Sequence, residues 1–305
     1  MQNKHINLTN IILMLFLITF WGSSFVIVKA ILREYLSPIA IATFRFLIAG
    51  LFFIIVLSLK RIRNPYNKIF VKKEDAPLLI TLAFSGVTIF FIAQYTGIQM
   101  ANASIASILV CLLSPILISL ISAYTFKERL SKKQLLGITT ASTGTLTVIL
   151  GGTPNIQTNS TFLAGSLILL STPILWTTYT LLGKSIMKKY NPFLIVTYVN
   201  TLGGLFLIPF SLAEDSFKNI LSLTNQEWLA ILYLALTCSL LGYFIWFHVM
   251  KHSSAAATSS FLFAEPLITV IFASIFIKEE ITLFIIGGAL LILIGVFLVM
   301  KTEHQ

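Results

Sequence analysis

Ten apolar stretches of 18 to 25 residues follow one another along this 305-residue chain. The hydrocarbon core of a bilayer is about 30 Å thick, and a helix needs about 20 apolar residues to cross it. Only 10% of the residues are charged, whereas a soluble domain carries roughly 25%. We therefore predict an all-α membrane protein with ten transmembrane helices. The predicted spans cover residues 9–30, 38–59, 76–97, 103–125, 133–150, 162–186, 192–212, 228–249, 254–277 and 281–300.

Lysine and arginine are distributed unequally between the two sides of these spans. If the N-terminus is cytoplasmic, fifteen of the 21 basic residues fall in cytoplasmic segments, and three (Arg33, Lys218 and Lys278) fall outside. Such an excess marks the cytoplasmic side of membrane proteins. We expect both termini in the cytoplasm, and a multi-pass protein of the plasma membrane, which is the inner membrane in a Gram-negative bacterium. Because orientation accounts for the basic excess, the lipid bilayer and not nucleic acid is the predicted partner.

The two halves of the chain resemble each other. Residues 115–137 align with 266–288 at a constant offset of 151, and residues 37–53 align with 191–207 at an offset of 154. Each half holds five predicted spans, and five is odd, so the second half enters the membrane from the opposite side. The sequence therefore predicts two inverted five-helix repeats.

Inverted repeats are typical of secondary transporters, whose substrate site lies near the bilayer midplane between the halves. The predicted boundaries are residues 1–150 for the first repeat, 151–161 for a linker on the outer side, and 162–305 for the second repeat.

Several motifs carry a family resemblance: "FWGSSFVIVKA" at residues 20–30, Arg45 in the second span, and the paired "P…KE…G" patterns of the fourth and ninth spans. Over two tandem units, residues 12–150 and 163–300, the chain resembles EamA-type members of the drug/metabolite transporter superfamily. The resemblance implies a ten-helix bundle whose central cavity is lined mainly by spans 1, 3, 4, 6, 8 and 9. It also implies alternating access, often for export, and often linked to protons or exchange. Members carry amino acids, nucleotide sugars, cationic drugs and other metabolites.

Glu265 is the acidic residue that lies deep in a predicted span. Eleven residues from the cytoplasmic end place it about 16 Å into the membrane. A charge there costs about 3 kcal/mol or more, so the carboxyl must face the bundle interior, pair, or be protonated. We predict a role in substrate binding or proton coupling. The alternative is a protonated carboxyl that only hydrogen-bonds a neighbouring helix. The aligned residue of the first half is Ser114.

Proline interrupts the fourth and ninth spans at corresponding places, Pro115 and Pro266. Proline removes a backbone donor and clashes with the preceding turn. Interrupted helices in corresponding places of two repeats point to the binding region, so both prolines are candidates for coupling or gating. A purely structural kink is the alternative.

Two tryptophans lie at matching depths in the first and sixth spans. Trp21 and Trp176 are about 18–21 Å from the span starts, too deep for the interfacial aromatic belts. Rings beside small hydroxyl groups suit an organic substrate, although helix packing is the alternative. The candidate substrate-binding residues are Trp21, Ser24, Trp176, Thr177, Tyr179 and Glu265.

Three basic residues fall within predicted spans. Lys29 and Lys184 lie near span ends at corresponding places, which favours snorkelling to lipid headgroups over the alternative of coupling or gating. Arg45 is about 10 Å deep. For it we expect a structural ion pair or a clamp on backbone carbonyls, with Glu279 or Glu280 as the candidate acidic partner.

Some other residues have simple structural interpretations. Tyr95 and Trp246 fall near span ends and are typical of interfacial belts, with the mouth of a cavity as the alternative. Ser131 and Gln134 have the spacing of a capping box at the start of a helix.

The sequence holds no phosphate-binding loop, no cluster with metal-ligand spacing and no nucleophile triad at one depth. We therefore expect no enzyme activity, no metal and no cofactor. The predicted function is secondary-active transport of a small organic metabolite such as an amino acid, as an exporter working by alternating access, with protons as a further partner. The alternatives are a passive facilitator or channel, and efflux of multiple or cationic compounds. Sequence does not identify the substrate or the oligomeric state, and a monomer is compatible with it.

Overall fold

The structure is a computed structural model, and it describes residues 8–32, 36–64, 66, 69–101, 103–126, 130–152, 160–277 and 283–301. The α-helices are α1 (Leu8–Ile31), α2 (Pro38–Arg63), α3 (Ala76–Ala83), α4 (Phe90–Met100), α5 (Ala103–Thr125), α6 (Lys132–Gly152), α7 (Ser160–Ile186), α8 (Pro192–Ala213), α9 (Asn225–Tyr233), α10 (Gly242–His252), α11 (Ala255–Ser260), α12 (Glu265–Ile277) and α13 (Leu283–Lys301). Short 3-10 helices cover Lys73–Asp75, Ser216–Ser222 and Phe261–Ala264. Arg33, Lys278, Glu279, Glu280 and most of the predicted linker lie outside the described residues.

Each predicted span coincides, to within a few residues, with a helical stretch of the described chain. Two of these stretches contain a π-helical turn, Phe84–Ile89 between α3 and α4 and Leu234–Leu241 between α9 and α10. Seven described stretches are long and apolar enough to cross a membrane: Leu8–Ile31, Pro38–Arg63, Lys73–Met100, Leu163–Ile186, Pro192–Ala213, Asn225–His252 and Ala255–Phe276.

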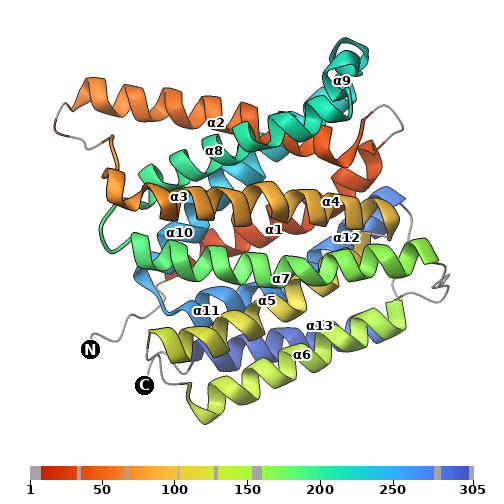
Figure 1. Cartoon of the computed structure of the whole chain (residues 1–305). Coiled ribbons are helices and arrows are strands. Elements are labelled where there is room, and N and C mark those ends of the chain that lie inside the picture. Colours follow the sequence, from red (N-terminus) through yellow and green to blue (C-terminus); the bar gives the residue numbers. More distant parts are fainter. Residues whose placement is uncertain are drawn as a thin grey trace.

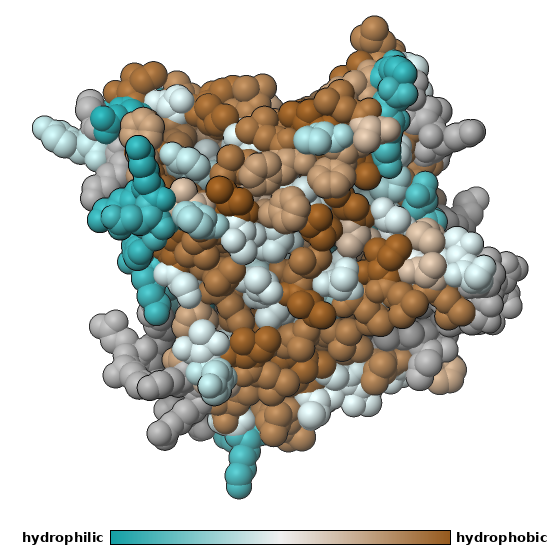
Figure 2. All heavy atoms as spheres, in the orientation of Figure 1, coloured by the Kyte–Doolittle hydropathy of each residue, from teal (hydrophilic) through white to brown (hydrophobic). Residues whose placement is uncertain are grey.

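The outer surface of the bundle is apolar between its two ends. Large exposed side chains include Leu51 and Ile54 on α2 and Leu290 and Phe297 on α13. Figure 2 shows this apolar surface, with hydrophilic residues gathered toward the ends. A monomeric soluble protein rarely exposes so large an apolar patch, whereas acyl chains are a matching solvent for it.

Helix α1 runs through the middle of the bundle and packs against α12, α10, α5 and α4. The pair α2 and α8 packs together on one side of it, and the pair α6 and α13 on the other (Figure 1). The start of α1 and the end of α13 lie at the same end of the bundle in this view.

Local sequence determines where several helices begin. Ser37 accepts a hydrogen bond from the Ala40 amide (3.1 Å) just before α2, and Asn191 accepts one from the Phe193 amide (2.9 Å) just before α8. Proline follows each cap at the first helical position, where its missing N–H costs nothing.

The predicted capping box at the start of α6 is confirmed. The Ser131 amide donates to Gln134 Oε1 (2.9 Å), and the Gln134 amide donates to Ser131 Oγ (3.1 Å).

The backbones of α6 and α13 touch at glycines. A Cβ atom added to Gly137 would lie 2.7 Å from the carbonyl oxygen of Gly295, and one added to Gly144 would lie 2.6 Å from that of Gly288. Small residues at membrane helix crossings permit this close approach. Because the neighbouring atoms are backbone, a larger side chain cannot be accommodated by a rotamer change.

We therefore expect Gly137→Val to lower the free energy of unfolding by about 1–3 kcal/mol, as overpacking does elsewhere. A thermal melt of the purified protein in detergent measures the effect. Gly287→Val on α13 is the matched control, because a Cβ there has no neighbour within 4 Å. Equal melting temperatures for the two variants would contradict the close crossing.

Candidate functional site: a cavity inside the helical bundle

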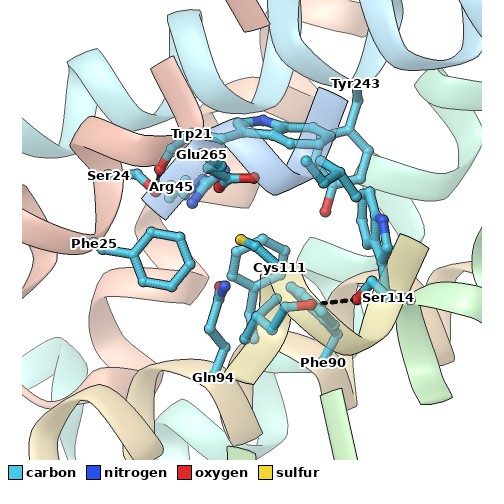
Figure 3. A pocket seen from close by; sticks show the side chains of 14 residues that line it. Trp21, Ser24, Phe25, Arg45, Phe90, Gln94, Cys111, Ser114, Tyr243 and Glu265 are labelled. Atoms are coloured by element: carbon cyan, nitrogen blue, oxygen red, sulfur yellow. Dashed lines mark hydrogen bonds between the residues drawn. The ribbon is translucent and has the colours of Figure 1, made fainter. Parts of the chain in front are cut away.

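A cavity lies between the helices of the bundle, with about 420 Å³ of empty space when the part open to the surroundings is included. It is lined by side chains from α1, α2, α4, α5, α7, α10 and α12 and from the 3-10 turn before α12 (Figure 3). Its walls are mostly aromatic and apolar, with a few polar groups, which is the usual make-up of a small-molecule site. The lining residues are Trp21, Ser24, Phe25, Arg45, Phe90, Phe91, Gln94, Val110, Cys111, Ser114, Trp176, Tyr243, Leu262 and Glu265.

Glu265 lies in the cavity wall, at the junction between a 3-10 turn and α12. Glu265 is 4% exposed, and the Cys111 thiol lies beside its carboxyl. Pro266 follows it directly. Proline has no N–H to donate to the carbonyl of Leu262, four residues back. The Glu265 amide donates to that carbonyl instead, and the residues before it, Phe261–Ala264, form a 3-10 turn.

The corresponding position in the first half carries different chemistry. Ser114 lines the cavity, and its hydroxyl donates to the Val110 carbonyl (2.6 Å), which Figure 3 draws as a dashed line. Helix α5 continues as an α-helix through Pro115, so the interruption expected there is absent from α5. Neither Pro115 nor Pro266 lines the cavity.

Trp21 and Trp176 meet at the cavity wall, with ring centroids 5.2 Å apart in an edge-to-face arrangement. Tyr243 and Trp246 complete what we call the aromatic cluster. Trp246 lies 5.6 Å from Trp21 and 5.4 Å from Trp176. The Trp21 indole donates to the Cys238 carbonyl (2.9 Å). Trp246 is 0% exposed, so its assignment to an interfacial belt is wrong.

Two of the predicted binding residues lie behind the cavity wall. Thr177 and Tyr179 are buried but do not line the cavity. The Tyr179 ring packs 5.1 Å from Trp176 and 5.0 Å from Phe247. Ser24 does line the cavity, and its hydroxyl donates to the Trp21 carbonyl (2.6 Å).

Arg45 lines the cavity as well, which the sequence did not predict. Its Nε donates to Ser239 Oγ (2.7 Å), and Nη1 donates to the Tyr95 hydroxyl. The guanidinium also lies 4.6 Å from the centre of the Phe91 ring. The expected carbonyl clamp is therefore replaced by hydroxyl groups and aromatic faces. Tyr95 is 1% exposed, so its belt assignment is also wrong.

Lys29 and Lys184 bind carbonyl groups at helix ends and do not line the cavity. Lys29 Nζ donates to the carbonyls of Ile98 and Ala101, both at 2.9 Å. Lys184 Nζ donates to the carbonyl of Ser253 (3.2 Å). A cation at a helix C-terminus is stabilised by the exposed carbonyls there. Snorkelling of Lys29 and Lys184 to lipid headgroups stays a prediction.

Some residues that line the cavity were not predicted, although their spacing or polarity in the sequence pointed to the cavity. Phe25 follows Trp21 by four residues, and Cys111 precedes Ser114 by three, so each pair shares a helix face. Gln94 is a polar residue inside a predicted span. Tyr243 is the second residue after the π-helical turn Leu234–Leu241, and such turns often occur at functional sites. No sequence pattern predicted that turn.

At the other side of the bundle, a polar cluster joins the start of α3 to the loop after α7. Lys189 Nζ lies 2.7 Å from Asp75 Oδ1, and the Tyr190 hydroxyl donates to Asp75 Oδ2 (2.8 Å). The hydrogen bond to Asp75 raises the pKa of Lys189, so this lysine keeps its charge to a higher pH than a free lysine does. The cluster ties the two halves of the chain together outside the apolar zone.

A multi-pass helical bundle around an interior cavity with aromatic walls and ionisable groups is the architecture of a membrane transporter. Within the described residues, no three His, Cys, Asp or Glu side chains are grouped to hold a metal ion. The chain belongs to the EamA-like transporter family, whose model matches it twice, over residues 8–150 and 163–301. It is a transporter and not an enzyme.

Relatives match the chain over nearly its whole length. A transporter of Archaeoglobus fulgidus named as uncharacterized is 29% identical, over 93% of this chain and 96% of its own. The transporter YyaM of Bacillus subtilis is 29% identical, over 96% and 93%. A Salmonella typhimurium protein named "Probable amino-acid metabolite efflux pump" is 24% identical, over 94% and 93%. A crystal structure with 14% identity superposes with a TM-score of 0.75 over 98% of this chain and 99% of that one, which shows the fold alone.

Proposed function

We propose that this transporter exports a small organic metabolite, an amino acid or a related compound, across the plasma membrane by alternating access. The observation that carries the proposal is the Glu265 carboxyl in the wall of an aromatic cavity. An ionisable group inside a membrane protein is costly to keep and marks a substrate or proton pathway. The name of the Salmonella relative supports both the direction and the class of substrate.

For the topology we propose ten membrane crossings in two inverted repeats, with α5, α6 and α13 crossing beside the seven longer stretches. Paired features support the two-fold relationship. Gly137 contacts Gly295 while Gly144 contacts Gly288, and these pairs exchange under the sequence offset of 151. The two π-helical turns also fall at corresponding places. Both termini would then be cytoplasmic, with the boundary between the repeats near residues 151–161.

Alternating access gives the aromatic cluster a role. Trp246 and Phe247 follow Tyr243 along α10 and so lie closer to His252. That end of α10 is the one proposed to be cytoplasmic. We propose that the aromatic cluster closes the cavity on that side. Opening to the cytoplasm would require Trp246 to part from Trp21 and Trp176.

Proton coupling follows if Glu265 binds either a proton or a cationic group of the substrate. The proton would be taken up when the cavity faces outside and released when a substrate amine arrives from the cytoplasm. Export and proton entry would then be linked, because one carboxylate serves both.

Proteoliposomes test this function. With protein reconstituted in one orientation, we expect radiolabelled amino acids to accumulate against their own gradient when a pH gradient is imposed. A passive facilitator would only equilibrate them. Because an aromatic cavity with a carboxylate also suits organic cations, a cationic dye should be tested in parallel. If the dye moves against its gradient and none of the amino acids does, the result would favour the efflux alternative and contradict the proposal.

Cys111 offers a built-in reporter of cavity access. Both cysteines are buried in the closed bundle, but Cys111 lines the cavity and Cys238 does not. We expect a membrane-impermeant maleimide to label Cys111 in a Cys238→Ser background, and a transported amino acid to slow that labelling severalfold. The measurement is the mass of the labelled protein over time, with Cys111→Ser as the control. Labelling that no transported compound slows would place the substrate elsewhere.

A further inference from the structure

Arg45 is a buried cation, and its contacts with the residues that the structure describes do not neutralise its charge. The residue is 2% exposed. It donates to the hydroxyl groups of Ser239 and Tyr95, and its guanidinium carbon lies 5.0 Å from the centre of the Phe46 ring and 4.6 Å from that of Phe91. All of these partners are neutral.

No carboxylate pairs with Arg45 within the described part of the chain; the ion pairs found there join Lys189 to Asp75 and Lys218 to Asp215. Glu265 lines the same cavity, yet it makes no ion pair with Arg45 among those residues either. Arginine stays protonated in proteins and presents five N–H donors, and two of them serve the hydroxyl groups. Among the described residues, the guanidinium therefore has N–H donors without an acceptor and no compensating charge, at a place where burial makes both costly.

A negatively charged group bound in the cavity could neutralise Arg45 and accept its remaining N–H donors. Arg45 reaches its wall together with the carboxamide of Gln94, which extends into the open space in Figure 3. A planar guanidinium matches a carboxylate with two parallel hydrogen bonds. We propose that Arg45 is the subsite for the carboxylate of the substrate, with Tyr95 and Ser239 as positioning residues that hold the guanidinium in place.

Comparison of the two halves supports a functional role for this charge. At the offset of 154, Arg45 aligns with Val199, just as Glu265 aligns with Ser114 at 151. The two charged groups of the cavity are thus positions where the halves differ in charge. If these residues served only to pack the helices, related residues would be expected at the aligned positions of the two halves. A substrate with a positive and a negative end instead requires opposite charges from the two halves.

This inference rests on the proposed function and narrows its substrate. The first half supplies a cation for a carboxylate, and the second half supplies an acid for an amine or a proton. Phe25, Phe90 and Trp176 line the remaining wall and suit an apolar side chain. The preferred substrate carries both charges, so amines that lack a carboxylate are poor substrates.

Two matched series of compounds test the subsite. One comprises L-phenylalanine, L-phenylalaninamide, 2-phenylethylamine and 3-phenylpropionate; the other comprises L-alanine, L-alaninamide, ethylamine and propionate. Binding is measured by thermal shift and by tryptophan fluorescence, and transport is measured in proteoliposomes. In at least one series we expect the amino acid to bind at least tenfold more tightly than its amide, since a hydrogen bond to a charged group is lost.

Variants assign that preference to Arg45. Arg45→Gln should abolish the preference for acid over amide, and Arg45→Lys should retain part of it because the charge remains without the planar fork. Tyr95→Phe should weaken it less, since the charge stays in place. Lys29→Gln is the matched control, because that cation lies outside the cavity, and the ratio should not change. The comparison of acid and amide binding uses the wild-type protein, so it tests the subsite even if Arg45→Gln does not fold.

The two proposals fail differently. Equal binding of acid and amide in both series, or no binding by either series, would overturn the carboxylate subsite. An acid preference unchanged in Arg45→Gln would overturn it too. Failure of the proposed function would instead appear as Arg45-dependent binding without uphill transport.

Discussion

A Glu265→Gln transporter is expected to lose movement of substrate against its gradient while still binding neutral parts of the substrate. Glutamine has nearly the shape of the protonated acid, so the cavity wall is retained, but it can neither release a proton nor pair with an amine. We expect accumulation driven by a pH gradient to fall at least tenfold. Exchange between labelled and unlabelled substrate, measured without a pH gradient, should be reduced less, because exchange does not require a net change of protonation.

Glu227→Gln is the matched control for this substitution. Glu227 is also buried, but it lies in the capping box at the start of α9, where its carboxylate accepts from the Thr224 amide (2.8 Å). A glutamine oxygen can accept the same bond, so transport should be nearly unchanged. Coupled transport that survives in Glu265→Gln would remove the proton from the mechanism.

Trp246→Ala should produce the largest loss of stability among single changes near the cavity. The ring is fully buried and packs against Trp21 and Trp176. Removing a buried large aromatic side chain costs about 3–5 kcal/mol, since lost burial and the residual cavity add together. A denaturant or thermal melt should show this, and Trp246→Phe should recover part of the loss.

Trp228→Ala is the control with the same chemical change. Trp228 is half-buried on α9 and packs against Phe44 (6.0 Å), away from the cavity. Its removal should cost clearly less. If the cluster also closes the cytoplasmic side, Trp246→Ala should increase maleimide labelling of Cys111 from that side, whereas Trp228→Ala should not. Equal stability losses would contradict the packing seen around Trp246.

The helices and part of the cavity could be predicted because the membrane simplifies the chemistry. Apolar length indicated the helical stretches, and the cost of a buried carboxyl pointed to Glu265. Depth alone separated Trp21 and Trp176 from belt residues, and both line the cavity.

The wrong interpretations arose because depth along a helix does not reveal the direction in which a side chain points. Tyr95 and Trp246 were placed by distance from a span end, yet both face the bundle interior. Thr177 follows Trp176 by one residue, which turns it about 100° around the helix and away from the cavity.

Long-range partners were also beyond the reach of sequence patterns. Arg45 binds Ser239, 194 residues away, and Tyr95, 50 residues away. Its depth required polar partners, but which hydroxyl groups supply them depends on how separate helices pack. The expected ion pair with Glu279 or Glu280 falls outside the described residues.

The glycine crossing of α6 and α13 has a consequence for how this chain can evolve. Gly137 and Gly144 in the first half, and Gly295 in the second, each lie so close to backbone atoms of the opposite half that a Cβ has no room. A larger residue at any of these three positions therefore clashes with the main chain of the other half, and no side-chain change in its own half relieves the clash. After a duplication, cavity positions such as Arg45 and Glu265 are free to diverge, whereas these three glycines are constrained by the opposite half.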